Sequence, residues 1–154
     1  MEKERLIRGT KHPRTNAELV AAVRQSAAGT HCNRYILVQR SSTQFSNTNQ
    51  DGRGIGIIGW AGRNHLFALT YILVLDGENF SIIKRAAAST GDESLISRGL
   101  GLNPIHGPSR KLEDVSFPAT PGEAASNPAL RDGVRALLAT SLDHTMPAML
   151  AEQR

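Results

Sequence analysis

Cysteine, aromatic side chains and long apolar runs are all scarce in this chain of 154 residues. Its one cysteine, Cys32, excludes an intrachain disulfide, so the fold does not depend on an oxidising compartment. The longest apolar run, residues 66–75, is shorter than the roughly 18 residues that a membrane-spanning helix needs. Residues 1–14 carry too many charges for a signal peptide. We therefore expect a cytoplasmic protein with no membrane partner.

Patterns that bind metals or cofactors are missing as well. None of the five histidines stands at a metal-ligand spacing from another histidine or from Cys32, and neither HxxxH nor CxxC occurs. A phosphate loop of the G-K-[ST] type is also absent. From these absences we expect neither a metal nor a cofactor.

What the chain does contain is the composition of a folded domain. Hydrophobic residues make up 40% and charged residues 21%, which is near the globular average and argues against wholesale disorder. The length suits a single hydrophobic core, because two cores would each have too few apolar residues. We expect a flexible basic arm over residues 1–12 and a single α+β domain over residues 13–154.

Positive charge is concentrated in the first part of the chain. The formal net charge is +4, with a sequence pI near 9.7. Residues 1–60 hold nine Lys and Arg against four Asp and Glu, whereas residues 61–154 hold nine against ten. Such an imbalance favours polyanionic partners, although a soluble protein that is merely basic has the same composition.

The first helix is predicted over residues 15–29. Thr15 and Glu18 stand in the capping-box relation, in which each side chain accepts a hydrogen bond from the other residue's exposed backbone N–H. Apolar residues then recur at helical spacing, and Gly29 offers the left-handed conformation that ends many helices.

A second amphipathic helix is predicted near the C-terminus. Asn127 is a typical capping residue, Pro128 suits the first helical position, and an apolar stripe follows despite Gly133. We expect the helix to break at Thr145-Met146-Pro147. Residues 89–126, which contain four prolines and show no period, are predicted to form one long loop before this helix.

Four segments between the helices have the β-branched and aromatic character of strands, and they span residues 34–42, 54–62, 65–75 and 78–88. Residues 43–53 have the composition of a loop. The near-continuous apolar character of residues 66–75 predicts a central strand that is buried on both faces. The order predicts an α+β fold: a helix, an antiparallel sheet of about four strands, a long loop and a helix, with both helices on one face of the sheet.

The dipeptide Asp76-Gly77 is the clearest hairpin signal, because it tolerates the positive φ angles of a two-residue type I′ turn. With that turn, Leu73 would face Phe80 and Tyr71 would face Ile82.

Residues 54–59 read GIGIIG, which is a literal G-x-G-x-x-G. In a dinucleotide-binding fold these glycines follow a buried strand and open a helix, but here too few residues separate Gly59 from the next strand to form one. A protein-kinase interpretation fails because the chain has neither HRD nor DFG. We interpret Gly52, Gly54, Gly56 and Gly59 as marks of a bent or bulged strand, or of a place where another backbone or a ligand comes close.

The leading functional hypothesis is a non-enzymatic protein that binds the backbone of a nucleic acid, RNA in preference to DNA. Arginine outnumbers lysine in the basic region, and its planar fork binds phosphate at two points. Trp60 offers an aromatic face for an unpaired base. The predicted contact residues are Arg5, Arg8, Lys11, Arg14, Arg24, Arg34, Arg40, Arg53, Trp60 and Arg63.

Two alternatives remain open. The first is a homo-oligomeric assembly module that pairs through its glycine-rich strand as an exposed sheet edge. The second is a small metal-independent RNase, in which His65, Lys84, Arg85 and Glu78 would supply acid, base and cation.

Overall fold

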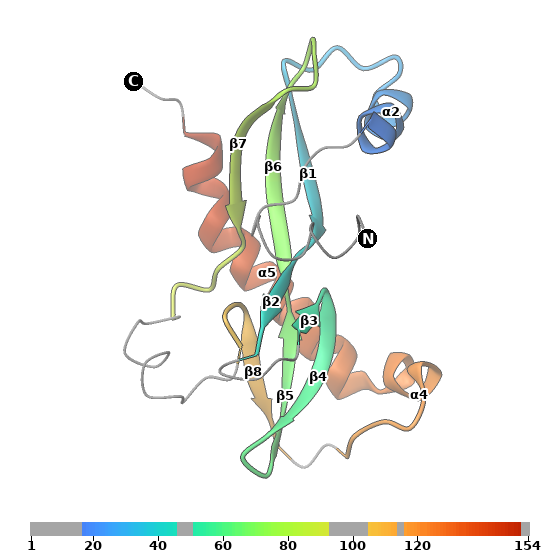
Figure 1. Cartoon of the computed structure of the whole chain (residues 1–154), viewed down its shortest axis with the longest axis vertical. Coiled ribbons are helices and arrows are strands. Elements are labelled where there is room, and N and C mark those ends of the chain that lie inside the picture. The colour runs from blue at the N-terminus through green and yellow to red at the C-terminus, as the bar shows by residue number, and fades with distance from the viewer. Residues whose placement is uncertain (1–16, 46–50, 93–104, 114–115, 152–154) are drawn as a thin grey trace, which may run out of the picture.

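The computed structural model describes residues 17–45, 51–92, 105–113 and 116–151 (Figure 1). This part of the chain contains helices and antiparallel strands, which confirms the predicted α+β class. In chain order the elements are α2 (Ala17–Ser26), β1 (Arg34–Arg40), β2 (Ser42–Gln44), β3 (Asp51–Arg53), β4 (Ile55–Trp60), β5 (Arg63–Ala68), β6 (Thr70–Asp76), β7 (Ile82–Ala87), β8 (Ser109–Leu112), α4 (Pro121–Ser126) and α5 (Pro128–Leu150).

A long central strand organises the sheet. It consists of β5 and β6, which follow each other with only Leu69 between them. β1 and β7 flank β6 in what we call the upper half, and β4 and β8 flank β5 in the lower half (Figure 1). The predicted central position of residues 66–75 is confirmed. The described sheet is therefore three strands wide, and its edges are built from shorter strands than the sequence suggested.

Hydrogen bonds at Leu69 join the two halves along one edge. Its N–H donates to Gly54 O at 2.7 Å, and its carbonyl accepts from Ser41 N at 3.0 Å. β1 and β4 thus follow each other along the central strand, and β2 and β3 form a small hairpin that projects between them. Residues 43–53, predicted as a loop, supply parts of this hairpin.

Helix α5 covers one face of the sheet along both halves. Side chains alternate in a strand, so the even-numbered residues of the central strand point to this helix. Leu66 and Ala68 pack against Leu130 and Leu137, while Ile72 and Val74 pack near Met149.

The opposite face has a different cover in each region. In the upper half, Val23 of α2 packs against Tyr71, Leu73 and Leu75. At the middle, Phe45 and Ile105 cover Phe67 and Leu69. The prediction that both helices lie on one face is wrong, because a strand that is apolar on both faces needs a cover on each.

Helix α2 ends near Gly29, whose φ is +83°, as predicted. Thr15, the predicted start of this helix, lies outside the described residues.

The hairpin between β6 and β7 differs from the prediction. Leu73 pairs with Arg85 and Tyr71 pairs with Ala87, so the loop is longer than two residues. The Asp76 carboxylate accepts hydrogen bonds from the backbone N–H groups of Glu78 and Asn79, which fixes a wider turn. The same two bonds, that from Asn79 first, lower the pKa of Asp76.

Gly77 in this loop is needed for space. A Cβ at this position would clash with the backbone carbonyl of Cys32. The residue with positive φ is Phe80, at +61°. Its ring stacks on Tyr35 with centroids 5.4 Å apart.

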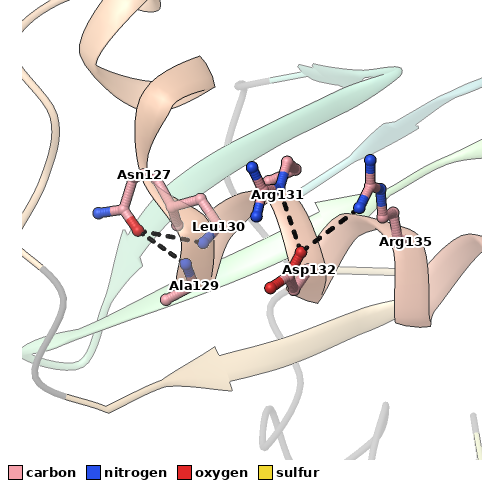
Figure 2. A network of polar contacts seen from close by, with 6 residues as sticks. All are labelled: Asn127, Ala129, Leu130, Arg131, Asp132 and Arg135. Carbon is pink, nitrogen blue, oxygen red and sulfur yellow. Dashed lines mark hydrogen bonds and ion pairs between the residues drawn. The ribbon is translucent and has the colours of Figure 1, made fainter.

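Helix α5 begins as predicted and ends later than predicted. The Asn127 side chain accepts hydrogen bonds from the N–H groups of Ala129 and Leu130, and Pro128 takes the first helical position (Figure 2). The predicted break at Pro147 is wrong. The helix continues to Leu150, because buried Met149 and the Lys84 ammonium, which donates to the Ala148 and Ala151 carbonyls, hold the last turn.

The segment 89–126 is not one loop. It contains β8, which pairs with β5, and the short helix α4. Thr120 caps α4, because its hydroxyl accepts from Glu123 N at 3.1 Å. Both elements are too short to produce a recognisable period, and β8 is a strand only because β5 lies beside it.

Candidate nucleic-acid interface

The lower half of the sheet has one face that no described helix covers. It is the face opposite α5, at the end where β4 turns into β5 (Figure 1). Ala61 and Gly62 form this turn with φ angles of 49° and 71°, the positive values of a two-residue hairpin. The turn places Trp60 directly across from Arg63.

The strand register adds two further side chains to this face. His65 pairs with Ile58 on one side and with Lys111 on the other. Because residues two apart in a strand share a face, Arg63 and His65 lie on the same side as Lys111. We call this set, Trp60, Arg63, His65 and Lys111, the open face.

The open face is electrostatically positive. Burial of the imidazole, followed by the positive charges of Lys111 and Arg63, lowers the pKa of His65 below its ordinary value of 6.5. A pKa below 6.5 keeps the His65 imidazole mainly neutral at pH 7. Glu113 approaches Lys111 at 3.7 Å, but both side chains are solvent-exposed, so this pair is weak.

A shallow cavity of about 560 Å³ adjoins the turn. Arg63, Asn64, Lys111 and Glu113 contribute to its lining. An anion that enters this cavity meets two cations and one carboxylate.

The predicted contact residues do not form a single patch. Trp60 and Arg63 meet on the open face, but the other described residues lie elsewhere. Arg24 stands over the Phe80 ring at 5.2 Å, at the far end of the upper half. Arg34 and Arg40 lie on β1 across from Asp76 and Thr70, on the α5 side of the sheet.

Arg53 is exposed on β3, across from Ser42. The four predicted arm residues, Arg5, Arg8, Lys11 and Arg14, lie outside the described residues.

Lys111 is a member of the open face that the sequence did not reveal, because it belongs to β8, which lies in a segment predicted to be a loop. Two consecutive charged residues, Arg110 and Lys111, before buried Leu112 do not show the alternation of a strand, and only the pairing with β5 identifies this segment as one.

The residues of the predicted RNase site are not brought together. Lys84 donates to the carbonyls at the end of α5, in the upper half. Arg85 lies on the other face of the sheet, across from Leu73, and His65 belongs to the lower half. Glu78 lies in the hairpin loop beside Asp76.

Gly52 and Gly56 make room for aromatic rings. A Cβ at Gly52 would overlap the Phe45 ring, and one at Gly56 would lie 2.6 Å from Phe67 Cζ. The two rings meet edge to face with centroids 5.5 Å apart. The sequence predicts a bent or bulged strand, or the approach of another backbone or a ligand. Instead, β4 pairs with β5 without a register shift, and the groups that approach Gly52 and Gly56 are side-chain rings.

Arg131 and Arg135 at the start of α5 share one nearby carboxylate. Both guanidinium groups lie near the carboxylate of Asp132, at 3.1 and 3.7 Å (Figure 2). The positive side chains of the open face have no comparably close acid apart from Glu113 among the described residues.

Within the described ranges, no three His, Cys, Asp or Glu side chains group in a way that would hold a metal ion. None of the described helices has the length and apolar character to cross a bilayer. Comparisons with protein-family models, curated proteins and solved structures give no match.

Proposed function

We propose that the protein binds single-stranded RNA on its open face, without catalysis. The observation that carries this proposal is the position of Trp60 beside Arg63, His65 and Lys111 on one uncovered sheet face. Single-strand binders combine an aromatic surface for base stacking with cations for the backbone, and this face offers both.

Each member of the open face has a distinct role in the proposal. The Arg63 fork binds phosphate oxygens at two points, and Lys111 acts as a compact positive charge. Trp60 stacks on a base. Neutral His65 donates or accepts a hydrogen bond, and a phosphate nearby favours its protonation.

The arm residues Arg5, Arg8, Lys11 and Arg14 remain proposed contacts that extend the path of the backbone. Arg24 lies against Phe80 in the upper half, and Arg34 and Arg40 lie on the α5 face of the sheet. Arg53 lies on the hairpin between the halves, so none of these four arginines belongs to the open face. The proposed site is thus narrower than the sequence indicated.

The test is a salt series with a fluorescent oligouridine, read by anisotropy. The double variant Arg63→Ala/Lys111→Ala should reduce the slope of log K against log salt concentration by about 1.4 in magnitude. Each lost phosphate contact on a single strand changes this slope by roughly 0.7. Trp60→Leu should weaken binding by about 1–3 kcal/mol, or roughly 5- to 150-fold in Kd. Circular dichroism verifies that each variant is folded.

Arg85→Ala is the matched control, since Arg85 is an exposed cation of the upper half. It should leave both affinity and slope unchanged. Affinity that does not vary between low and moderate salt, or a double variant with the parent slope, would contradict the proposal.

A second candidate function is the assembly module. In the described sheet β4 is an edge strand, and its Ile55 is 52% exposed. Light scattering tests this directly: an oligomer that Ile55→Lys dissociates supports it, and a monomer at high concentration rejects it.

A further inference from the structure

The outer edge of β1 is open in the described structure. β1 pairs with β6 on one side, and no described strand pairs with its other side (Figure 1). An unpaired strand edge presents a row of backbone N–H and C=O groups that another extended chain is able to bind.

The side chains on the α5 side of β1 form a regular pattern. Arg34, Ile36, Val38 and Arg40 alternate with half-buried residues, and all four are exposed. Ile36 is 44% and Val38 is 43% exposed, whereas their partners across the strand pair, Val74 and Ile72, are almost fully buried. We call these four residues the β1 strip: two apolar side chains between two arginines.

The β1 strip lies beside an apolar cluster formed by β6 and α5. Leu142 and Met146 of α5 pack against the cluster of Ile72 and Val74, and both remain partly exposed. The opposite flank of α5 faces β7 and the segment after it, because His144 lies against Gly91 and Thr145 bonds to Ser89. Leu142 and Met146 therefore lie over Ile72 and Val74, which pair directly with Val38 and Ile36 of the strip.

Charge decides which occupant suits the strip. If a second copy added antiparallel about Leu37, Arg34 of one chain would face Arg40 of the other, and like charges directly opposite each other destabilise a strand pair. A nucleic acid would need stacking surfaces where the strip has two aliphatic side chains. An acidic segment with apolar residues at its centre satisfies both parts of the pattern.

We propose that β1 binds an extended segment of a partner protein as an added strand. Along that segment, alternate side chains read acidic, apolar, apolar, acidic, so that carboxylates face Arg34 and Arg40 while apolar side chains cover Ile36 and Val38. Backbone hydrogen bonds supply affinity, and the alternating side chains supply specificity. This site lies away from the open face and does not depend on RNA binding.

The probe is a capped, fluorescently labelled peptide, Thr-Glu-Thr-Ile-Thr-Val-Thr-Glu-Thr, titrated with the full chain and read by anisotropy. A scrambled peptide of the same composition, and one with both Glu replaced by Lys, should each bind roughly tenfold more weakly or not at all. Equal binding of the three peptides, or no binding of the first at millimolar protein, overturns the proposal.

Paired variants locate the site. Ile36→Lys should weaken binding of the first peptide by about tenfold or more. Ile83→Lys is the matched control, because Ile83 is also 44% exposed but lies on β7, at the other edge. The charge reversal Arg34→Glu/Arg40→Glu should transfer preference to the Lys-flanked peptide. Equal effects of the two isoleucine variants, an unchanged preference after charge reversal, or dimerisation through β1 would each reject the proposal.

Discussion

The upper and lower halves of the central strand have opposite surroundings. Six of the seven residues of β6 are buried, against three of the six residues of β5. Helix α2 and helix α5 enclose β6 from both sides, while β5 has α5 on one face and the open face on the other (Figure 1). One continuous strand thus serves as core in one half and as accessible surface in the other.

The residues themselves account for this difference. β6 is apolar at odd and even positions alike, so it is stable only between two layers. β5 begins with Arg63 and His65 on one face and places Leu66 and Ala68 on the other. Stability is therefore concentrated in the upper half, and the lower half is free to carry a polar site. Four sets of substitutions test this difference between the halves, in order of expected effect.

Removal of a core side chain from the upper half should have the largest effect. Leu73→Ala should lower the free energy of unfolding by about 2–5 kcal/mol, because Leu73 is fully buried between the sheet and α2. His65→Ala, at an equivalent strand position in the lower half, should change it by less than about 0.5 kcal/mol. Urea denaturation measures both. Similar losses of unfolding free energy at the two positions would contradict the conclusion that stability is concentrated in the upper half.

The second largest effect on stability should come from the glycines in the hairpin turns of the two halves. Gly77→Ala in the upper turn should cost about 1–3 kcal/mol, because the new Cβ meets the Cys32 carbonyl, which is backbone and has to shift. In the lower turn, a Cβ at Gly62 would meet no other atom. Gly62→Ala should therefore cost only the roughly 1 kcal/mol that a non-glycine residue needs to adopt a positive φ angle. Thermal and urea unfolding measure the stability of both variants. A larger loss of unfolding free energy for Gly62→Ala than for Gly77→Ala would contradict this prediction.

The two ends of α5 allow a finer comparison, since its N-terminus lies over the lower half and its C-terminus over the upper. Asn127→Ala removes a cap that satisfies two N–H groups and should cost about 1 kcal/mol. Lys84→Met removes a cation from the C-terminal carbonyls and should cost about 0.3–1 kcal/mol. Urea unfolding of the two variants at the same salt concentration compares their stabilities. A larger loss of unfolding free energy for Lys84→Met would show that the C-terminal end of α5 contributes more to stability than the N-terminal cap.

The smallest effect should be the pH dependence contributed by His65. Its pKa is lower in the folded chain than the ordinary 6.5, so the unfolded chain binds the proton more readily between these two values. The contribution to stability is complete above about pH 6.5 and is lost as the pH falls through the folded pKa. His65→Gln should flatten this part of the pH profile of unfolding.

An independent readout is the NMR titration of His65. In Lys111→Gln its pKa should rise, because one of the two positive charges that lower it is gone. A pKa that stays the same would mean that Lys111 does not face the imidazole.

Much of the fold could be predicted where a signal is local. The Asn127 cap, the Gly29 stop and the central strand all depend on neighbouring residues, and all three are confirmed. Errors arose where tertiary contacts outweigh a local rule. Pro147 does not end α5, and Asp76 builds a wider turn than its dipeptide suggested.

The candidate site was predictable only in part. Trp60 and Arg63 were named from the sequence, and the turn between them is short enough to guarantee that they meet. Lys111 was missed, since it arrives from a strand more than forty residues away in the sequence. The remaining described arginines were expected to converge, but they lie on different elements and faces.

The sequence by itself determined the α+β class, the start of α5 at its Asn127 cap and the two-sided burial of the central strand, because these follow from periodicity and from side chains that bond to their own backbone. The tertiary structure decided which cations share a face and which helix covers it. The physical reason is strand register: neighbouring side chains in a strand point to opposite faces, so the pairing of distant segments assigns each arginine to one side or the other. Arg34 and Arg40 lie on the α5 side, and Arg63 and Lys111 lie on the open face.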